Sequence, residues 1–176
     1  HTDGVYAIVG LHPIHTDKSF HDEQELGVGG GTTTPGPDGS IRAGFTSRGE
    51  EFDSLKYKEL ALDPKVVGIG ECGLDYYRME EDTIKKQKRN FEAQVAFADE
   101  VGKPLMLHVR NSPDGRQSAY KDTLEILKSI NPKVKGDIHF FAGSIEDARA
   151  YLDFGFMVSF TGVITFPTCL PARQES

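Results

Sequence analysis

The chain has 176 residues, which is enough to bury one sizeable hydrophobic core. Its 27 acidic residues outnumber its 20 basic ones, which gives a formal net charge of -7. This charge argues against a protein that coats nucleic acid by general electrostatic attraction. The two cysteines, Cys72 and Cys169, lie far apart without a C-x-x-C pair, which argues against a zinc knuckle or a disulfide framework. This cysteine usage suits a reducing cytosol, so we expect a cytoplasmic protein. No apolar run approaches the length of a membrane span and no signal peptide opens the sequence, so we expect no membrane contact.

The first predicted element is a short strand. The apolar, β-forming run at 5–11 predicts a buried strand that ends at His12 and Pro13. The histidines in the loop that follows, His15 and His21, are expected to be surface residues.

A glycine-rich stretch and a helix come next. From about 27–49, glycine, threonine and proline dominate without apolar periodicity, which predicts a mobile surface insertion. Its glycines do not follow a strand and precede no G-K-[ST], so they do not indicate a phosphate-binding loop. Apolar spacing resumes at 50–62 and predicts a helix that ends before Pro64.

The stretch at 65–77 predicts a buried strand that leads into a glycine-rich loop, with Glu71 at the point where the apolar run ends. An ionised glutamate is costly to bury unpaired. In α/β proteins, the ends of strands are also where ligands and chemistry collect. Glu71 is therefore a metal ligand, a catalytic carboxylate or a paired structural charge, since ion-pair networks also place carboxylates at strand ends.

The second half of the chain alternates helices and strands at roughly even spacing. Apolar residues at three- and four-residue steps predict the helices, and short runs of β-forming residues predict the strands. In chain order they are a helix at 79–101, a strand at 105–110, a helix at 120–130, a strand at 137–141, a helix from 145 that Gly155 ends, and a strand at 156–160. About five strands alternating with helices indicate an α/β fold with a parallel sheet. An open doubly wound sheet and part of a (β/α) barrel are both compatible with this order.

Three predicted strands carry a metal-capable side chain near their carboxyl ends: Glu71, His108 and His139. Parallel neighbours deliver those ends to the same face, so the three groups could converge into one pocket. Imidazole and carboxylate are ligands for zinc, manganese or a similar divalent ion. Such an ion lowers the pKa of a bound water, and two ions that share a carboxylate would clamp a phosphate. A single histidine inside a strand is more often a hydrogen-bonded core residue, but three such groups on three strands are less easily chance.

Five further residues lie near this predicted pocket. His12 ends the first strand in the same way, and Arg110 follows the strand histidine by two residues and so points the same way, toward a substrate anion or an acidic partner. Asp75 and Tyr76 lie in the loop above the glutamate and could hold a second shell of ligands or a substrate. Cys72 alternates away from the glutamate, which favours packing over ligation.

These residues occur in motifs that resemble the TatD family of metal-dependent deoxyribonucleases, within the amidohydrolase-like barrels. The matching motifs follow the family order and cover most of the chain from Val5 to about Phe166. They are Gly10-Leu11-His12-Pro13, Gly70-Glu71-Cys72-Gly73-Leu74-Asp75-Tyr76, Phe91-x-x-Gln94, His108-Val109-Arg110, His139-Phe140-Phe141 with Gly143, and Gly155 leading into Phe160-Thr161-Gly162. The Gly-Glu-Cys-Gly-Leu-Asp-Tyr element is the specific one.

The resemblance implies a TIM-like (β/α) barrel, with 1–176 as a single metal-dependent hydrolase domain interrupted by the insertion at about 27–49. Two family features are missing. Nothing before Val5 supplies the His-x-His of the family's first strand, and no acidic Glu-Thr-Asp strand follows Phe166. A full barrel has eight strands and typically about 250 residues, so we expect an incomplete barrel that lacks about three strands.

The resemblance also implies roles for the site residues. Glu71 would be a catalytic carboxylate shared by, or adjoining, two divalent ions, with Mg, Mn or Zn as candidates. His108 and His139 would be ligands of one of these ions. The other residues of the pocket would face the substrate and its phosphates: His12, Asp75, Tyr76 and Arg110.

The implied reaction is hydrolysis of phosphodiester bonds in DNA by a metal-activated water, as in a deoxyribonuclease or exonuclease. Single-stranded or 3′ ends would suit a pocket at the mouth of a barrel better than an intact duplex. Two other interpretations stay open. The chain could be a truncated, non-catalytic product that binds a metal or a partner chain, or an amidohydrolase-like enzyme acting on an ester, lactone or amide.

Overall fold

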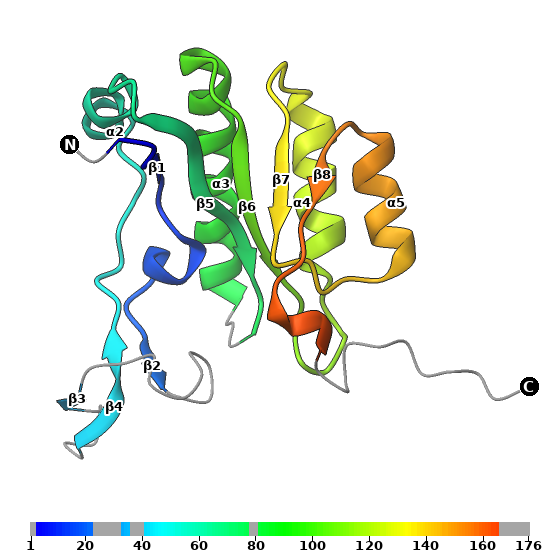
Figure 1. The fold of residues 1–176 in the computed structure, drawn as a ribbon. Helices are drawn as coiled ribbons and strands as arrows, with labels where there is room; N and C mark the ends of the chain where they lie inside the picture. The colour runs from blue at the N-terminus through cyan, green and yellow to red at the C-terminus, as the bar shows by residue number, and fades with distance from the viewer. Residues whose placement is uncertain (1–2, 23–32, 36–40, 78–80, 166–176) are drawn as a thin grey trace, which may run out of the picture.

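The predicted strands form one parallel sheet in the order β1-β5-β6-β7-β8, shown in Figure 1. The computed structural model describes residues 3–22, 33–35, 41–77 and 81–165. The strands are β1 (Ala7–Val9), β5 (Val66–Asp75), β6 (Leu105–Arg110), β7 (Gly136–His139) and β8 (Met157–Val158). All neighbouring pairs in this sheet are parallel, which confirms the predicted α/β fold.

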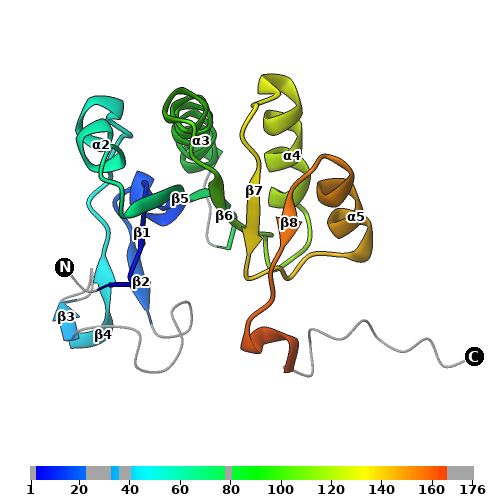
Figure 2. The same ribbon diagram turned by 45° about the horizontal axis from the view of Figure 1, so that its top comes forward.

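The described α-helices cover one face of this sheet (Figure 2). They are α2 (Ser54–Ala61), α3 (Glu81–Val101), α4 (Ala119–Ile130) and α5 (Ile145–Asp153), and the short 3-10 helices η1 (Pro13–Thr16) and η2 (Gly162–Thr165) follow β1 and β8 in the chain. A parallel sheet with helices outside it is the arrangement of a (β/α) barrel. Within the described residues the sheet does not close, so this is a barrel segment. None of the described helices is long and apolar enough to span a membrane.

The hydrophobic core lies between the sheet and its helices. Along β6, Leu105, Leu107 and Val109 are buried and alternate with partly exposed residues, because successive side chains of a strand point to opposite faces. The buried residues pack against α3 and α4, where Phe91 and Leu127 are fully buried. Each such side chain contributes about 1.5–3 kcal/mol when it leaves water. The partly exposed residues of β6, including the predicted site residues, therefore lie on the open face.

The first predicted strand and the first predicted helix are both shorter than expected. β1 begins at Ala7, and Val5 and Tyr6 are each 60% exposed, because β1 is the edge strand of the described sheet. α2 begins only after Asp53, whose carboxylate accepts hydrogen bonds from the backbone N–H groups of the first helical turn. Leu55 is 80% exposed, so the apolar spacing that predicts this helix does not mark a buried face.

The stretch expected to be a mobile insertion contains two strands that the sequence analysis does not predict. β3 (Thr33–Pro35) and β4 (Ile41–Thr46) pair with each other, and β4 also pairs with β2 (Phe20–Asp22), which forms an antiparallel ribbon in the order β2-β4-β3. The rest of the insertion up to residue 40 lies outside the described residues. Figure 1 places the ribbon beyond the carboxyl ends of the parallel strands, which is the side of the predicted site.

The two loop histidines expected at the surface, His15 of η1 and His21 of β2, both pack against Phe45 of this ribbon. His21 is only 4% exposed, and its ring stacks on Phe45 with 5.0 Å between ring centroids. His15 is partly buried and lies 5.5 Å from the same ring. The surface prediction fails because burial of His21 depends on Phe45, its cross-strand partner, which lies 24 positions further along the chain.

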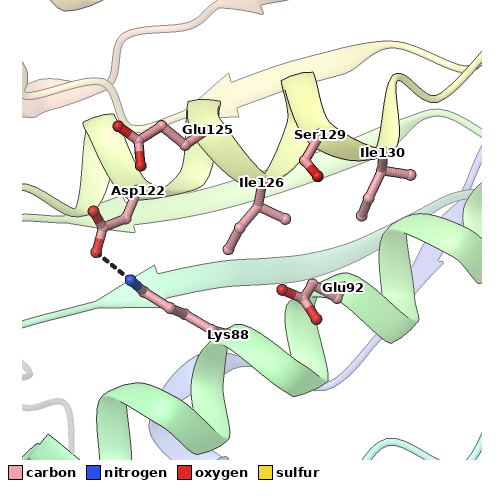
Figure 3. Close-up of a pocket in the computed structure, with 7 residues that line it drawn as sticks. All are labelled: Lys88, Glu92, Asp122, Glu125, Ile126, Ser129 and Ile130. Carbon is pink, nitrogen blue, oxygen red and sulfur yellow. Dashed lines mark ion pairs between the residues drawn. The ribbon is translucent and has the colours of Figure 1, made fainter.

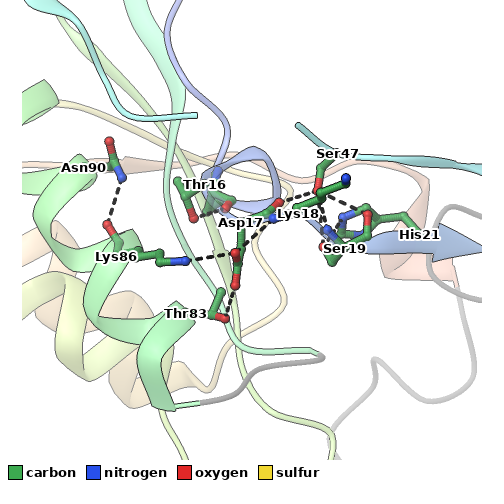
Figure 4. Close-up of polar contacts among 10 residues, drawn as sticks. Thr16, Asp17, Lys18, Ser19, His21, Ser47, Thr83, Lys86 and Asn90 are labelled. Carbon is green, nitrogen blue, oxygen red and sulfur yellow. Dashed lines mark hydrogen bonds and ion pairs between the residues drawn. The ribbon is translucent and has the colours of Figure 1, made fainter. Parts of the chain in front are cut away.

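Asp17 joins the base of the ribbon to α3, as Figure 4 shows. Its carboxylate accepts a hydrogen bond from the Thr83 hydroxyl at 2.7 Å and pairs with the Lys86 ammonium at 3.0 Å. On the other side, the Ser47 hydroxyl donates to the backbone carbonyl of Asp17 and accepts from the backbone N–H of Ser19 at 2.9 Å. The ribbon is thus held to the barrel segment at the exit of β4.

Candidate metal centre

Glu71 lies at an irregularity in β5 that turns its side chain toward the open face. The pairing of β5 with β6 runs from Gly70 opposite Met106 directly to Cys72 opposite Leu107, so Glu71 has no partner in the ladder. An extra residue of this kind re-aims a side chain, and such irregularities are common beside active sites. The Glu71 side chain is 32% exposed, and three imidazoles surround its carboxylate.

His108 lies between two carboxylates. Its Nε2 is 2.7 Å from Asp75 Oδ2, and its Nδ1 is 3.7 Å from Glu71 Oε2. Burial lowers the pKa of His108, but the hydrogen bond to Asp75 and the neighbouring Glu71 carboxylate outweigh burial and raise it to about 8. The neighbouring His108 in turn lowers the pKa of Glu71, even though burial raises it. Both acids are therefore ionised near neutral pH.

Asp75 supports His108 and does not face the open side of the site. The residue is 2% exposed, and burial raises its pKa, yet the hydrogen bond from His108 holds the pKa below the usual value of 3.8. A buried carboxylate behind a histidine fixes the ring orientation and tautomer of a metal-ligating imidazole. The sequence leaves Asp75 as either a support for a metal ligand or a substrate contact, and its geometry favours support of His108.

His12 approaches Glu71 from the loop after β1. Its Nε2 lies 3.6 Å from Glu71 Oε2, and its ring lies 4.2 Å from that of His108. His12 also caps η1, because its Nδ1 accepts the backbone N–H of Ile14 at 3.3 Å. Burial and the nearby His108 lower the pKa of His12 to about 3, so the ring is neutral and its proton sits on Nε2. His12 therefore points an N–H donor into the site.

His139, the third predicted ligand, lies beside the other carboxylate oxygen of Glu71. His139 ends β7, directly beside His108 in the sheet register, and its Nε2 lies 3.9 Å from Glu71 Oε1. Its side chain is 35% exposed. Arg110 lies at the end of β6 on the same face, where its guanidinium stacks 3.7 Å from the centroid of the Tyr77 ring.

Tyr76 does not reach this cluster. Its side chain is 1% exposed, and its hydroxyl donates to Asp122 Oδ2 at 2.7 Å. Asp122 also pairs with Lys88 at 2.7 Å in a groove between α3 and α4, on the helical side of the sheet (Figure 3). The structure therefore places Tyr76 in the core on the helical side of the sheet, and the expected contact with a substrate is not formed there. Cys72 is fully buried, as its alternation predicts, and burial raises the pKa of its thiol.

Gln94 is a site-positioning residue to which the sequence reasoning assigned no role. It is 1% exposed on α3, and its side-chain amide makes two hydrogen bonds to the backbone of Leu11: Oε1 accepts from N–H at 2.7 Å and Nε2 donates to the carbonyl at 3.0 Å. These bonds fix the chain one residue before His12. The signal was present in the Phe91-x-x-Gln94 motif, but a motif does not say what its glutamine contacts.

The donor set fits a divalent metal ion. Nitrogen or oxygen atoms of His12, Glu71 and His108 all lie within 4.8 Å of one another. The imidazole-to-carboxylate separations of 3.6–3.9 Å are long for hydrogen bonds. They suit ligand atoms that share an ion, because atoms bound tetrahedrally to zinc at about 2.1 Å lie roughly 3.4 Å apart. His12 belongs to this group by distance, with an N–H facing the centre in the neutral tautomer that η1 capping favours. His139 lies beside the other carboxylate oxygen of Glu71.

A barrel segment with imidazoles and a carboxylate gathered at the carboxyl ends of its strands defines the class of metal-dependent hydrolases with a TIM-like fold. The comparison with family models is more specific. The model described as TatD related DNase matches residues 1–174. The chain therefore belongs to the TatD family, as its motifs predict.

Individual relatives agree with this family. The chain is 41% identical over 113 residues to an "Uncharacterized metal-dependent hydrolase" of Buchnera aphidicola subsp. Baizongia pistaciae, covering 64% of this chain and 40% of that protein. It is 38% identical over 104 residues to the "3'-5' ssDNA/RNA exonuclease TatD" of Klebsiella pneumoniae, covering 58% and 36%. The crystal structure of YJJV, a TatD homolog from Escherichia coli K12, superposes with a TM-score of 0.63 at 22% identity, over 96% of this chain and 51% of that one. This likeness supports the fold. The chain spans less than half the length of the curated relatives it matches.

Proposed function

We propose that this protein hydrolyses phosphodiester bonds of DNA, as a nuclease or exonuclease acting on single strands, with water activated at a divalent metal centre. The carrying observation is the Glu71 carboxylate with three imidazole nitrogens 3.6–3.9 Å from its oxygens. Family membership supports hydrolysis. The name of the Klebsiella relative supports a single-stranded nucleic acid as substrate.

In this proposal Glu71, His108 and His139 hold the metal. Glu71 directs Oε2 toward His108 and Oε1 toward His139, so one carboxylate could serve two ions. Mg²⁺, Mn²⁺ and Zn²⁺ are candidates for a set of oxygen and nitrogen donors. A bound ion of this kind makes water a nucleophile near neutral pH and neutralises charge on a phosphate.

The remaining residues orient the metal ligands and the substrate. When the His108 ring is neutral, Asp75 accepts its Nε2 proton and so leaves Nδ1 as a lone pair for the metal. His12 carries a proton on Nε2 and can donate it in a hydrogen bond to a phosphate oxygen beside Glu71. Arg110, held flat on Tyr77 at the end of β6, is placed to bind a second phosphate of the strand.

The test measures metal-dependent release of nucleotides from an end-labelled single-stranded oligonucleotide. The Glu71→Gln variant keeps the shape of the side chain and removes its charge, so we expect the rate to fall at least about 100-fold. Glu100→Gln is the matched control, since Glu100 pairs only with Lys58 among the contacts found for it and lies 54% exposed on α3. Full activity of Glu71→Gln, or a folded wild-type chain that is inert with all three metals, would contradict the proposal. So would hydrolysis of carboxylic esters with phosphodiesters left intact.

A further inference from the structure

The metal centre opens into a cavity with an aromatic wall. The cavity measures about 500 Å³, and Glu71 and His12 lie on one side of it. Ile14, His15 and Phe45 line the same cavity. Phe45 belongs to β4 of the inserted ribbon, so a segment outside the parallel sheet contributes directly to the space beside the proposed ligands.

The Phe45 ring is held in place before any ligand binds. It stacks on His21 with an interplanar angle of 28°, because the two residues are paired across β2 and β4. His15 packs against the same ring at an angle of 41°. The His21 ring is fixed in turn by a contact of 2.8 Å between its Nε2 and the Ser19 hydroxyl. A ring held by two neighbouring imidazoles, with part of it still lining the cavity, loses little conformational entropy when a ligand stacks on it.

The ribbon that carries Phe45 is also fixed to the barrel segment. Ser47, two residues beyond Phe45, is 2% exposed and hydrogen bonds to residues Asp17 and Ser19. The backbone N–H of Glu50 donates to the carbonyl of His15 at 2.7 Å, which closes the base of the ribbon. Asp17 continues the connection to α3 (Figure 4). The distance between Phe45 and Glu71 is therefore set by the fold.

We propose that Phe45, supported by His15 and His21, is the wall on which a nucleobase of the substrate stacks next to the metal centre. This inference rests on the proposed function, because it places a base in the cavity where Glu71 would meet the phosphate. Bases of single strands are unpaired and stack readily on aromatic side chains, whereas bases in a duplex are occupied by their neighbours. The wall thus favours single strands over duplexes.

The charge of the chain strengthens the argument. Proteins that track single strands usually combine aromatic stacking with a basic groove. With a net charge of -7, this chain offers little general attraction to phosphates, so binding must depend on local contacts, among them the metal ion, Arg110 and stacking. The cavity combines the proposed metal ligand Glu71 with a stacking surface, since the apolar wall of Ile14 and Phe45 faces the same space.

A tryptophan reporter tests the wall directly, because the chain contains no tryptophan. In Phe45→Trp, a phosphorothioate oligothymidylate, which resists hydrolysis, should quench the indole emission, and an abasic strand of the same length should quench it far less. Tyr6→Trp is the control, since Tyr6 is 60% exposed just before β1 and is not among the residues that line the cavity. An unchanged Phe45→Trp emission while fluorescence anisotropy shows the strand bound would overturn the inference.

Cleavage kinetics separate this inference from the proposed function. We expect wild type to cleave base-bearing strands at least about fivefold faster than abasic ones, the lower range for stacking of one base on an aromatic side chain. Phe45→Leu should bring this ratio close to one, and Phe45→Tyr should keep it. Cleavage with the same ratio in wild type and Phe45→Leu would reject the stacking wall and leave the nuclease intact. Base-dependent quenching without any cleavage would reject the nuclease and leave the wall. If neither quenching nor cleavage occurs, both are wrong.

Discussion

Asp75 Oδ2 lies 2.7 Å from His108 Nε2, and this contact decides which nitrogen of the imidazole faces Glu71. The other oxygen of Asp75 accepts the backbone N–H of Tyr77 at 2.9 Å. With both oxygens accepting, His108 must donate from Nε2, so once a metal displaces the second ring proton it is Nδ1, 3.7 Å from Glu71 Oε2, that offers the lone pair. The pair Asp75 and His108 thus prepares a metal ligand on the open face of the sheet.

The first prediction follows from this geometry and concerns Asp75→Asn. The asparagine must keep its carbonyl oxygen on the Tyr77 N–H, so its amide N–H₂ turns toward His108 Nε2. Two donors cannot share this contact, so the His108 proton moves to Nδ1 and blocks the metal lone pair. We expect metal affinity to fall about 10- to 100-fold, measured by calorimetric titration with Mn²⁺ or Zn²⁺.

The control for this change is Asp122→Asn, which alters a carboxylate on the helical side of the sheet that pairs with Lys88 and accepts from Tyr76. Its metal affinity should match that of wild type. Equal affinities for Asp75→Asn and wild type, with both proteins folded by circular dichroism, would show that Asp75 does not set the tautomer of His108.

The second prediction concerns Gln94, whose side-chain amide hydrogen bonds to both the backbone N–H and the backbone carbonyl of Leu11. Gln94→Met keeps the length of the side chain but leaves one buried N–H and one buried carbonyl of Leu11 without these partners. Each unsatisfied group costs about 1–3 kcal/mol, so we expect the free energy of unfolding in urea to fall by about 2–6 kcal/mol. Gln117→Met, at an exposed position before α4, should change it by less than about 0.5 kcal/mol. A similar small change in both variants would contradict this role of Gln94.

Much of the sheet and of the metal centre could be predicted because their signals are local. The alternation in β6 and the apolar steps in α3 place each element from a few neighbouring residues. Glu71, His108 and His139 could be expected to converge because the carboxyl ends of parallel strands meet at one edge, and the structure brings all three together.

The remaining features depend on contacts between distant residues. The ribbon forms because Phe20–Asp22 pairs with 44–46, and a glycine-rich sequence gives no periodic sign of that pairing. The buried position of Tyr76, by contrast, could be predicted from the sequence. The alternation that assigns Cys72 to the core also assigns Leu74 and Tyr76 to it, and all three are buried.

The third prediction tests this corrected position of Tyr76. Tyr76→Phe removes the hydroxyl that donates to Asp122 at 2.7 Å and leaves the buried ring in place. We expect the free energy of unfolding to fall by about 1 kcal/mol, because Asp122 keeps its pair with Lys88. The ratio kcat/KM for an oligonucleotide should stay within about twofold of wild type, because Tyr76 does not reach the site. A twofold change in kcat/KM corresponds to less than about 0.5 kcal/mol. A large loss of kcat/KM with stability unchanged would mean that Tyr76 contacts the substrate, as the sequence analysis expects.

The fourth prediction is a pH dependence of stability that originates in Asp17. Hydrogen bonds from Thr83 and Lys86 lower the pKa of the Asp17 carboxyl below its ordinary value of 3.8. The folded state therefore binds this proton more weakly than the unfolded state. The stabilisation is fully present above the unfolded pKa and is lost as the pH falls through the lower, folded one. Asp17→Asn keeps an oxygen for Thr83 but loses the charge that attracts Lys86.

We expect Asp17→Asn to lower the free energy of unfolding by about 1 kcal/mol near pH 7, a value typical of a partly exposed ion pair. Since wild-type Asp17 becomes neutral in acid, the difference between the two proteins should shrink below about pH 4. Urea unfolding of both proteins at neutral and acidic pH measures this difference, and all other carboxylates titrate equally in the pair. Asp3→Asn, at an exposed position, should show no such dependence. A difference between wild type and Asp17→Asn that persists unchanged in acid would mean that Asp17 stabilises the ribbon through its shape and its hydrogen bonds, without a contribution from its charge.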